Sequence, residues 1–133
     1  MNDVALSQAF RRVGRDRGRD KEDRFLKLFR YGRVPPGFPD WFRGIRSASQ
    51  EEDCRGIDAI AFTDDVGKIF LQIKSSRAGV EKFKKQQEKY RKREWIFPIV
   101  VRDTDSDAEI LEKTRYVLSQ ARIKILNHRN SSY

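Results

Sequence analysis

Two β-rich runs joined by a short turn decide the fold of this chain. They are Gly56-Ile57-Asp58-Ala59-Ile60-Ala61-Phe62-Thr63 and Lys68-Ile69-Phe70-Leu71-Gln72-Ile73-Lys74. The link between them, Asp64-Asp65-Val66-Gly67, contains residues that favour tight turns. We therefore predict an antiparallel hairpin at the centre of the chain.

Working outward from the hairpin, apolar spacing and turn residues predict further elements on both sides. They are helices at 3–13, 20–32, about 80–90 and about 110–121, strands at 41–48, 95–101 and 123–126, and a tail from 128 to 133. Strand–helix–strand passages normally make parallel right-handed crossovers. The sequence thus predicts an α/β fold, with a mixed central sheet and helices on both faces.

Length and charge limit the range of functions. With 133 residues there is room for one domain over 1–133, which we expect to have its core at about 20–126 and a flexible tail at 127–133. The formal net charge of +9 favours a polyanionic partner such as nucleic acid. The alternative is a basic surface that only keeps the protein soluble.

The cellular setting is predicted from what the sequence contains. Cys54 is its only cysteine, so no disulfide can form within the chain. No stretch resembles a signal peptide, and no apolar run approaches the ~20 residues that cross a bilayer. We expect a cytoplasmic protein without a membrane partner.

Three polar residues interrupt the apolar pattern of the hairpin: Asp58, Gln72 and Lys74. Gln72 and Lys74 share one face of their strand because side chains alternate. A three-residue loop, 65–67, would set Asp58 opposite Lys74 on that face, whereas a two- or four-residue loop would set it on the other face. The turn sequence favours the three-residue loop.

A carboxylate, an amide oxygen and an ammonium group together suit metal-assisted hydrolysis of a phosphoester. Mg²⁺ prefers oxygen ligands, and a lysine can stabilise charge that grows on the phosphate. The structural alternative is a buried ion pair between Asp58 and Lys74, with Gln72 as a hydrogen-bonded neighbour. Asp53 is expected to be a solvated loop acid, the alternative being an auxiliary metal ligand, and His128 is assigned no role.

The spacing of these residues matches a known pattern. Asp58, thirteen intervening residues and then Gln72-Ile73-Lys74 resemble the Asp…(Glu/Gln)-x-Lys signature of the PD-(D/E)XK nuclease superfamily, most of all its Mrr-type restriction branch. The stretch 17–22, Arg-Gly-Arg-Asp-Lys-Glu, resembles the start of the first helix in archaeal Holliday-junction resolvases, which places an active-site glutamate at Glu22. The alternative for Glu22 is an ordinary first-turn acid favoured by the helix dipole. The expected element order resembles the superfamily core over residues 20–101.

The resemblance implies a restriction-endonuclease-like core and a DNA endonuclease of restriction or junction-resolving type. It implies Mg²⁺ as cofactor, with Mn²⁺ as a substitute, held by Asp58, Gln72 and Glu22, and it makes Lys74 the fourth catalytic residue. A homodimer would allow both strands to be cut, and RNA stays open as a substrate. Phosphate contacts are expected from nearby basic residues: Arg17, Arg19, Arg77, Lys82, Lys84 and Lys85. The alternative function is a non-catalytic nucleic-acid-binding module on the same fold.

Overall fold

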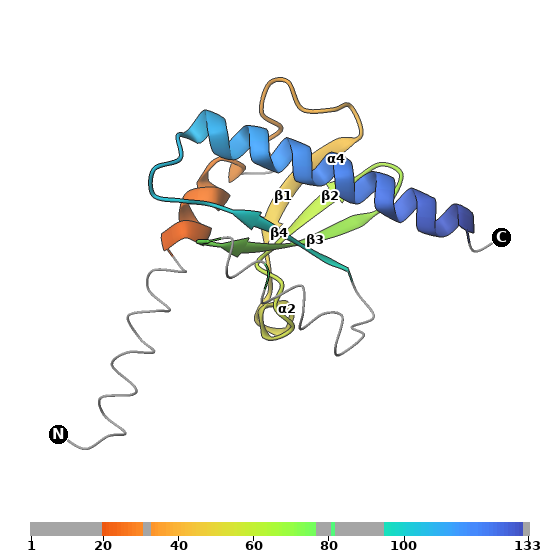
Figure 1. Ribbon diagram of the computed structural model, residues 1–133, viewed down its shortest axis with the longest axis horizontal. Helices are drawn as coiled ribbons and strands as arrows, with labels where there is room; N and C mark the ends of the chain where they lie inside the picture. The colour runs from red at the N-terminus through yellow and green to blue at the C-terminus, as the bar shows by residue number, and fades with distance from the viewer. Residues whose placement is uncertain (1–19, 31–32, 77–80, 82–94, 132–133) are drawn as a thin grey trace, which may run out of the picture.

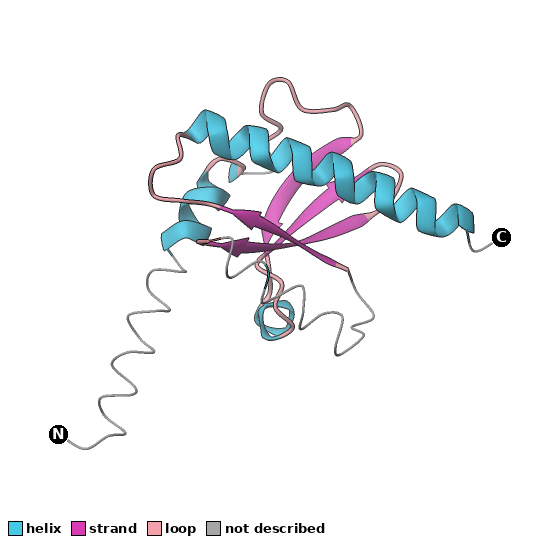
Figure 2. Ribbon diagram, in the orientation of Figure 1, coloured by secondary structure: helices cyan, strands magenta, loops and turns pink. Residues whose placement is uncertain are grey.

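The computed structural model describes residues 20–30, 33–76, 81 and 95–131. It shows an α/β fold in which one helix crosses a twisted sheet (Figures 1 and 2). A helical segment at 20–27 opens the described chain. The elements that follow are β1 (Phe42–Ser47), α2 (Gln50–Cys54), β2 (Ala59–Thr63), β3 (Lys68–Lys74), β4 (Ile96–Val100) and α4 (Asp107–Ser131).

The four strands form one open mixed sheet in the order β1-β2-β3-β4. β2 runs antiparallel to both β1 and β3, and β4 runs parallel to β3. The predicted hairpin and the predicted parallel fourth strand are therefore confirmed. The right-handed crossover rule made the second of these predictable, since some 20 residues separate β3 from β4 and can carry a crossover.

The hairpin register differs from the predicted one by two residues. Ala59 pairs with Leu71 and Phe62 pairs with Lys68, so the turn closes over Asp64, Asp65 and Val66 rather than over 65–67. The backbone N–H of Thr63 donates to the Gly67 carbonyl at 3.0 Å, and Gly67 has a φ of 77°. Continued by one residue, this register sets Asp58 beside Gln72, and the predicted position opposite Lys74 is wrong.

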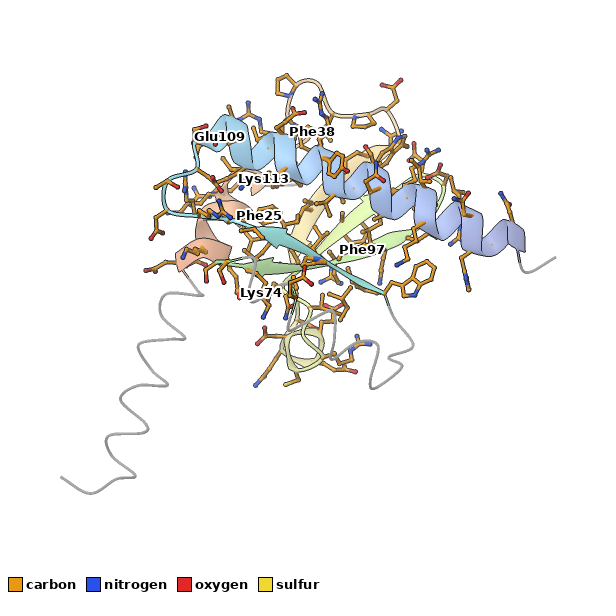
Figure 3. The ribbon with its side chains drawn as sticks, viewed as in Figure 1. Phe25, Phe38, Lys74, Phe97, Glu109 and Lys113 are labelled. Atoms are coloured by element: carbon orange, nitrogen blue, oxygen red, sulfur yellow. The ribbon has the colours of Figure 1, made fainter. Side chains whose placement is uncertain are left out.

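The main core lies between the sheet and α4. It gathers Leu71 and Ile73 from β3, Ile110 and Leu118 from α4, and Phe25 from the first helical segment, which packs on the same face as α4. Because side chains alternate along a strand, Gln72 and Lys74 lie on the opposite face. Figure 3 shows Lys74 on that side and Phe25 between the sheet and α4. A smaller cluster of Ile57, Ile60 and Ile96 forms the second face.

Two predicted segments have a different structure. The segment before Asp53, expected to be a loop, contains the short helix α2, which begins with a capping box between Ser49 and Glu52. The strand expected at 123–126 and the tail expected from 127 are wrong as well, because α4 continues unbroken to Ser131. Its apolar stripe continues through Ala121 and Ile125 into the core cluster.

β4 is the last strand of the sheet in the part of the chain that the structure describes. Pro98 lies in its middle. The N–H of Val101 donates to the Lys74 carbonyl at 2.8 Å, so the N–H of every second residue before it also turns towards β3. The nitrogen of Pro98 therefore lies on the outer edge, where a proline removes no bond of the sheet.

Several predicted elements fall outside the described residues. They are the helix at 3–13, most of the helix at about 80–90, and the end of the tail at 132–133. The prediction that helices cover both faces of the sheet depends on the second of these. Of that helix the structure describes Glu81 alone, which has a helical conformation.

Candidate functional site

Asp58 lies at the entrance to β2 and is fixed there by the backbone of β3. Its own N–H donates to the Leu71 carbonyl at 2.8 Å, and its Oδ2 accepts the N–H of Ile73 at 2.7 Å. Both bonds hold the carboxylate at the end of the hairpin. Burial nevertheless raises the pKa of Asp58, while the bond from Ile73 and the positive charge of Lys74 lower it. The net shift is upward because desolvation is the largest effect.

Glu22 approaches Asp58 from the first helical segment, and the two carboxyl groups interact directly. Burial is the largest cause that raises the pKa of Glu22 to about 7, followed by the negative charge of Asp58 and a hydrogen bond with its side chain. The same hydrogen bond lowers the pKa of Asp58. Burial and the neighbouring carboxyl group thus both favour the protonated form of Glu22, as expected for two acids that a protein brings together.

Gln72 lies beside this pair on the facing strand. Its Oε1 is buried and accepts no hydrogen bond from any residue that the structure describes. A buried polar atom in that state costs roughly 1–3 kcal/mol. Such a cost at one atom, next to two acids, is typical of a site that is completed by something else.

Lys74 is two residues beyond Gln72 on the same face of β3, and its charge acts on Asp58. It stands at the C-terminal end of the strand, half-buried, where β3 also pairs with Val100 of β4. The structure thus brings together Glu22, Asp58 and Gln72, with Lys74 within electrostatic range of Asp58. The simple buried Asp58–Lys74 ion pair does not account for the carboxyl–carboxyl contact.

Asp53 has more influence on the site than its predicted role as a solvated loop acid implies. It belongs to α2, and its negative charge raises the pKa of both Glu22 and Asp58. The signal that could have found α2 is the spacing Ser49-x-x-Glu52: Ser49 Oγ accepts the Glu52 N–H at 3.2 Å, and Glu52 Oε1 accepts the Ser49 N–H at 2.9 Å.

The donor set fits a hard divalent cation. It offers two carboxylates and one amide oxygen, and Mg²⁺ is usually held by one or two carboxylates together with water and substrate phosphate. No cluster of three or more histidine, cysteine, aspartate or glutamate side chains with metal-binding geometry occurs among residues 20–30, 33–76, 81 and 95–131. The unpartnered oxygen of Gln72 is the third donor, and a neutral one.

The basic residues expected to contact phosphates lie outside the described residues: Arg17, Arg19, Arg77, Lys82, Lys84 and Lys85. Their positions in the chain flank the site, since Arg17 and Arg19 precede Glu22 and the others follow Lys74. None of the helices whose placement is described is both long enough and apolar enough to cross a membrane.

Comparisons with family models, with curated proteins and with solved structures found no match to this chain.

Proposed function

We propose that this chain is a metal-dependent nuclease with a restriction-endonuclease-like core and an active site formed by Glu22, Asp58, Gln72 and Lys74. The observation that carries the proposal is the contact between the carboxyl groups of Glu22 and Asp58 beside the buried Gln72 Oε1, which accepts no hydrogen bond from the described residues. These groups together form a cluster of oxygen donors at one end of the sheet. The substrate is DNA, hydrolysed internally as restriction or junction-resolving enzymes do.

Each residue has a role that follows from its chemistry. Glu22, Asp58 and Gln72 would hold Mg²⁺, or Mn²⁺ in its place. The ion would supply charge neutralisation and a more acidic bound water. Lys74 stabilises the negative charge that grows on the phosphate in the transition state, and the β3 backbone keeps Asp58 in position through the Ile73 N–H.

Two further parts of the proposal concern the assembly and its setting. Arg17, Arg19, Arg77, Lys82, Lys84 and Lys85 contact the phosphates of the DNA, which gives affinity without sequence preference. A homodimer in the cytoplasm would place two sites on opposite strands. Salt dependence of binding tests the first part, because counterion release makes phosphate contacts weaken steeply with salt.

The test is cleavage of supercoiled plasmid and of branched junctions with Mg²⁺, Mn²⁺ or EDTA. Lys74→Ala should lose roughly 100- to 1000-fold in rate while DNA binding is retained, because its contact is made only in the transition state. Asp58→Asn should lose cleavage and metal binding together. Gln72→Glu should stay active, since it supplies a charged oxygen donor.

Matched controls separate the site from general effects of charge. Lys27→Ala and Asp103→Asn make the same chemical changes at exposed positions, the Asp103 side chain being 92 % exposed. Both should cut like the parent. A parent that binds DNA but cuts nothing with any metal would favour the non-catalytic binding module. A folded Lys74→Ala protein that cuts at the parent rate would mean that the active site lies elsewhere.

A further inference from the structure

A pocket lies where β3 begins, at the end of the strand away from Lys74. It is a cavity of about 430 Å³ lined by Val66, Lys68, Phe70, Trp95, Ile125, His128 and Arg129. β3 rises by ~3.3 Å per residue, so Lys68 is roughly 20 Å from Lys74. Trp95 neighbours Phe97 of β4, with ring centroids 6.5 Å apart. This pocket is distinct from the acidic site.

The pocket exists because β4 begins later than β3. Pairing between the two strands starts at Phe70 and Ile96, so the first two residues of β3 have no partner on β4. Trp95 stands directly before β4 and faces the C-terminal half of α4. Its ring centroid is 4.9 Å from that of His128, and Lys124 Nζ lies 5.0 Å from the Trp95 centroid. The rings of Trp95 and His128 thus lie side by side, and the Lys124 ammonium group contacts the Trp95 ring.

The charges around the pocket have one sign. Lys68 and Arg129 line it, and no acidic side chain does so among the described residues. Arg129 donates to the carbonyls of Asp65 and Val66 at 3.1 Å, and no carboxylate among the described residues pairs with it. The Asp65 carboxylate itself is bonded to Arg122 at 2.8 Å. The larger cavity between β4 and α4, about 740 Å³, differs because Glu81 lines it and only Lys124 is basic there.

From this arrangement we infer that the pocket binds an unpaired nucleotide of a nucleic-acid strand. The base stacks against Trp95, and the adjoining phosphate meets Lys68 and Arg129. Aromatic rings bind bases of any sequence by stacking, and cations follow the backbone. The inference rests on the proposed function and narrows its substrate class to DNA with single-stranded or frayed segments, such as branched structures.

Binding measured in EDTA tests the inference apart from cleavage. The probes are a labelled single strand of about twelve nucleotides, the duplex of the same sequence and an abasic strand of equal length. Lys68→Glu is compared with Lys27→Glu, an equal change of net charge at an exposed position outside the pocket. We expect Lys68→Glu to bind the single strand roughly tenfold more weakly than the control. Duplex binding should fall equally in both variants.

Tryptophan emission gives a second readout. The chain has two tryptophans, so Trp41→Phe leaves Trp95 as the only one. The single strand should quench its emission, and the abasic strand should not. Melting temperatures of all variants are measured first, and Lys68→Glu, at an exposed residue, carries the test if Trp41→Phe fails to fold.

Three results would overturn the inference. Equal losses in Lys68→Glu and Lys27→Glu would show that the pocket does not take part. Equal binding of the abasic strand would show that only charge acts there, and displacement of the strand by an equally charged polyglutamate would favour an acidic peptide. Failure of the proposed function looks different: the parent protein cuts nothing with Mg²⁺ or Mn²⁺, while the strand still quenches Trp95.

Discussion

Asp58 and Asp105 are both withdrawn from water, yet their environments are opposite. Asp105, 8 % exposed, accepts the Arg102 N–H at 2.9 Å and pairs with Lys113 at 2.7 Å, and the pair lowers its pKa. Asp58 also accepts one backbone N–H, but its side chain bonds to a second carboxyl group, that of Glu22, and burial raises its pKa. One backbone bond is common to both, so the difference in pKa comes from the Lys113 bond at Asp105 and from desolvation at Asp58.

The comparison shows how one residue type serves two purposes. Asp105 is satisfied by a cation and connects β4 to the start of α4, where Figure 3 shows Lys113 close to the sheet. Asp58 is held in place by a backbone bond and contacts a second carboxyl group, next to the Gln72 oxygen, which accepts no hydrogen bond in the part of the chain that the structure describes. Acids left in that state cost stability and are found mostly at functional sites.

The largest effect that tests this difference is on stability. Asp105→Asn should lower the free energy of unfolding by ~2 kcal/mol, because a charge-assisted bond to Lys113 is lost. For a domain of this size that is roughly 7 °C in melting temperature. Asp58→Asn should leave the stability unchanged or raise it, since it removes a negative charge from beside Glu22. Thermal unfolding at neutral pH measures both.

Equal destabilisation by Asp105→Asn and Asp58→Asn would remove the distinction between the two aspartates. Asp103→Asn, at an exposed position, controls for the change of one charge.

The next effect is on the pH dependence of stability without metal. The pKa of Glu22 is raised from 4.5 to about 7, so the folded protein binds this proton more tightly than the unfolded chain does. Its contribution is present in full below pH 4.5 and is lost as the pH rises through about 7. Because Glu22 is only half-buried, we expect a loss of roughly 1–2 kcal/mol.

Denaturant unfolding between pH 4.5 and 8 measures this slope, and Glu22→Gln should remove it. Asp105 acts in the opposite sense and at lower pH: its lowered pKa stabilises above its ordinary value of 3.8 and is lost on acidification. A parent protein whose stability rises steadily from pH 4.5 to 8 would contradict the raised pKa of Glu22.

The smallest effect is stabilisation by Mg²⁺ itself. A ligand present at ten times its dissociation constant stabilises by roughly 1.4 kcal/mol. Millimolar Mg²⁺ should therefore raise the melting temperature of the parent by a few degrees. Asp58→Asn should lose this shift, and Asp105→Asn, although less stable, should keep it. An equal shift in all three proteins would mean that Mg²⁺ acts elsewhere.

The hairpin and the parallel fourth strand could be predicted because local pattern decides them. Two β-rich runs flank a turn that needs a left-handed residue, and Gly67 supplies it. The register could not be fixed in the same way, since both 64–66 and 65–67 can close a three-residue turn. The Thr63 hydroxyl stabilises the turn over 64–66. It donates to the Gly67 carbonyl at 2.8 Å and accepts the Val66 N–H at 3.1 Å.

The end of the chain was mispredicted because a local preference competed with helical spacing. Ile123-Lys124-Ile125 alternates like a strand, but Leu118, Ala121 and Ile125 follow one another at helical intervals. Their burial against the sheet outweighs the small β preference of isoleucine. At the candidate site, sequence spacing selected Asp58, Gln72 and Lys74, but only the fold shows that Glu22 contacts Asp58.

Pro98 has a consequence for how two molecules could meet. An outer strand with free donors and acceptors invites a second strand to join it and extend the sheet. With proline in the middle of β4, that edge lacks an N–H donor where a partner strand would need one. Addition of a strand from a second molecule at this edge is therefore disfavoured. Pairing of two copies through β4 is disfavoured for the same reason, and this edge is poorly suited to aggregation by strand addition.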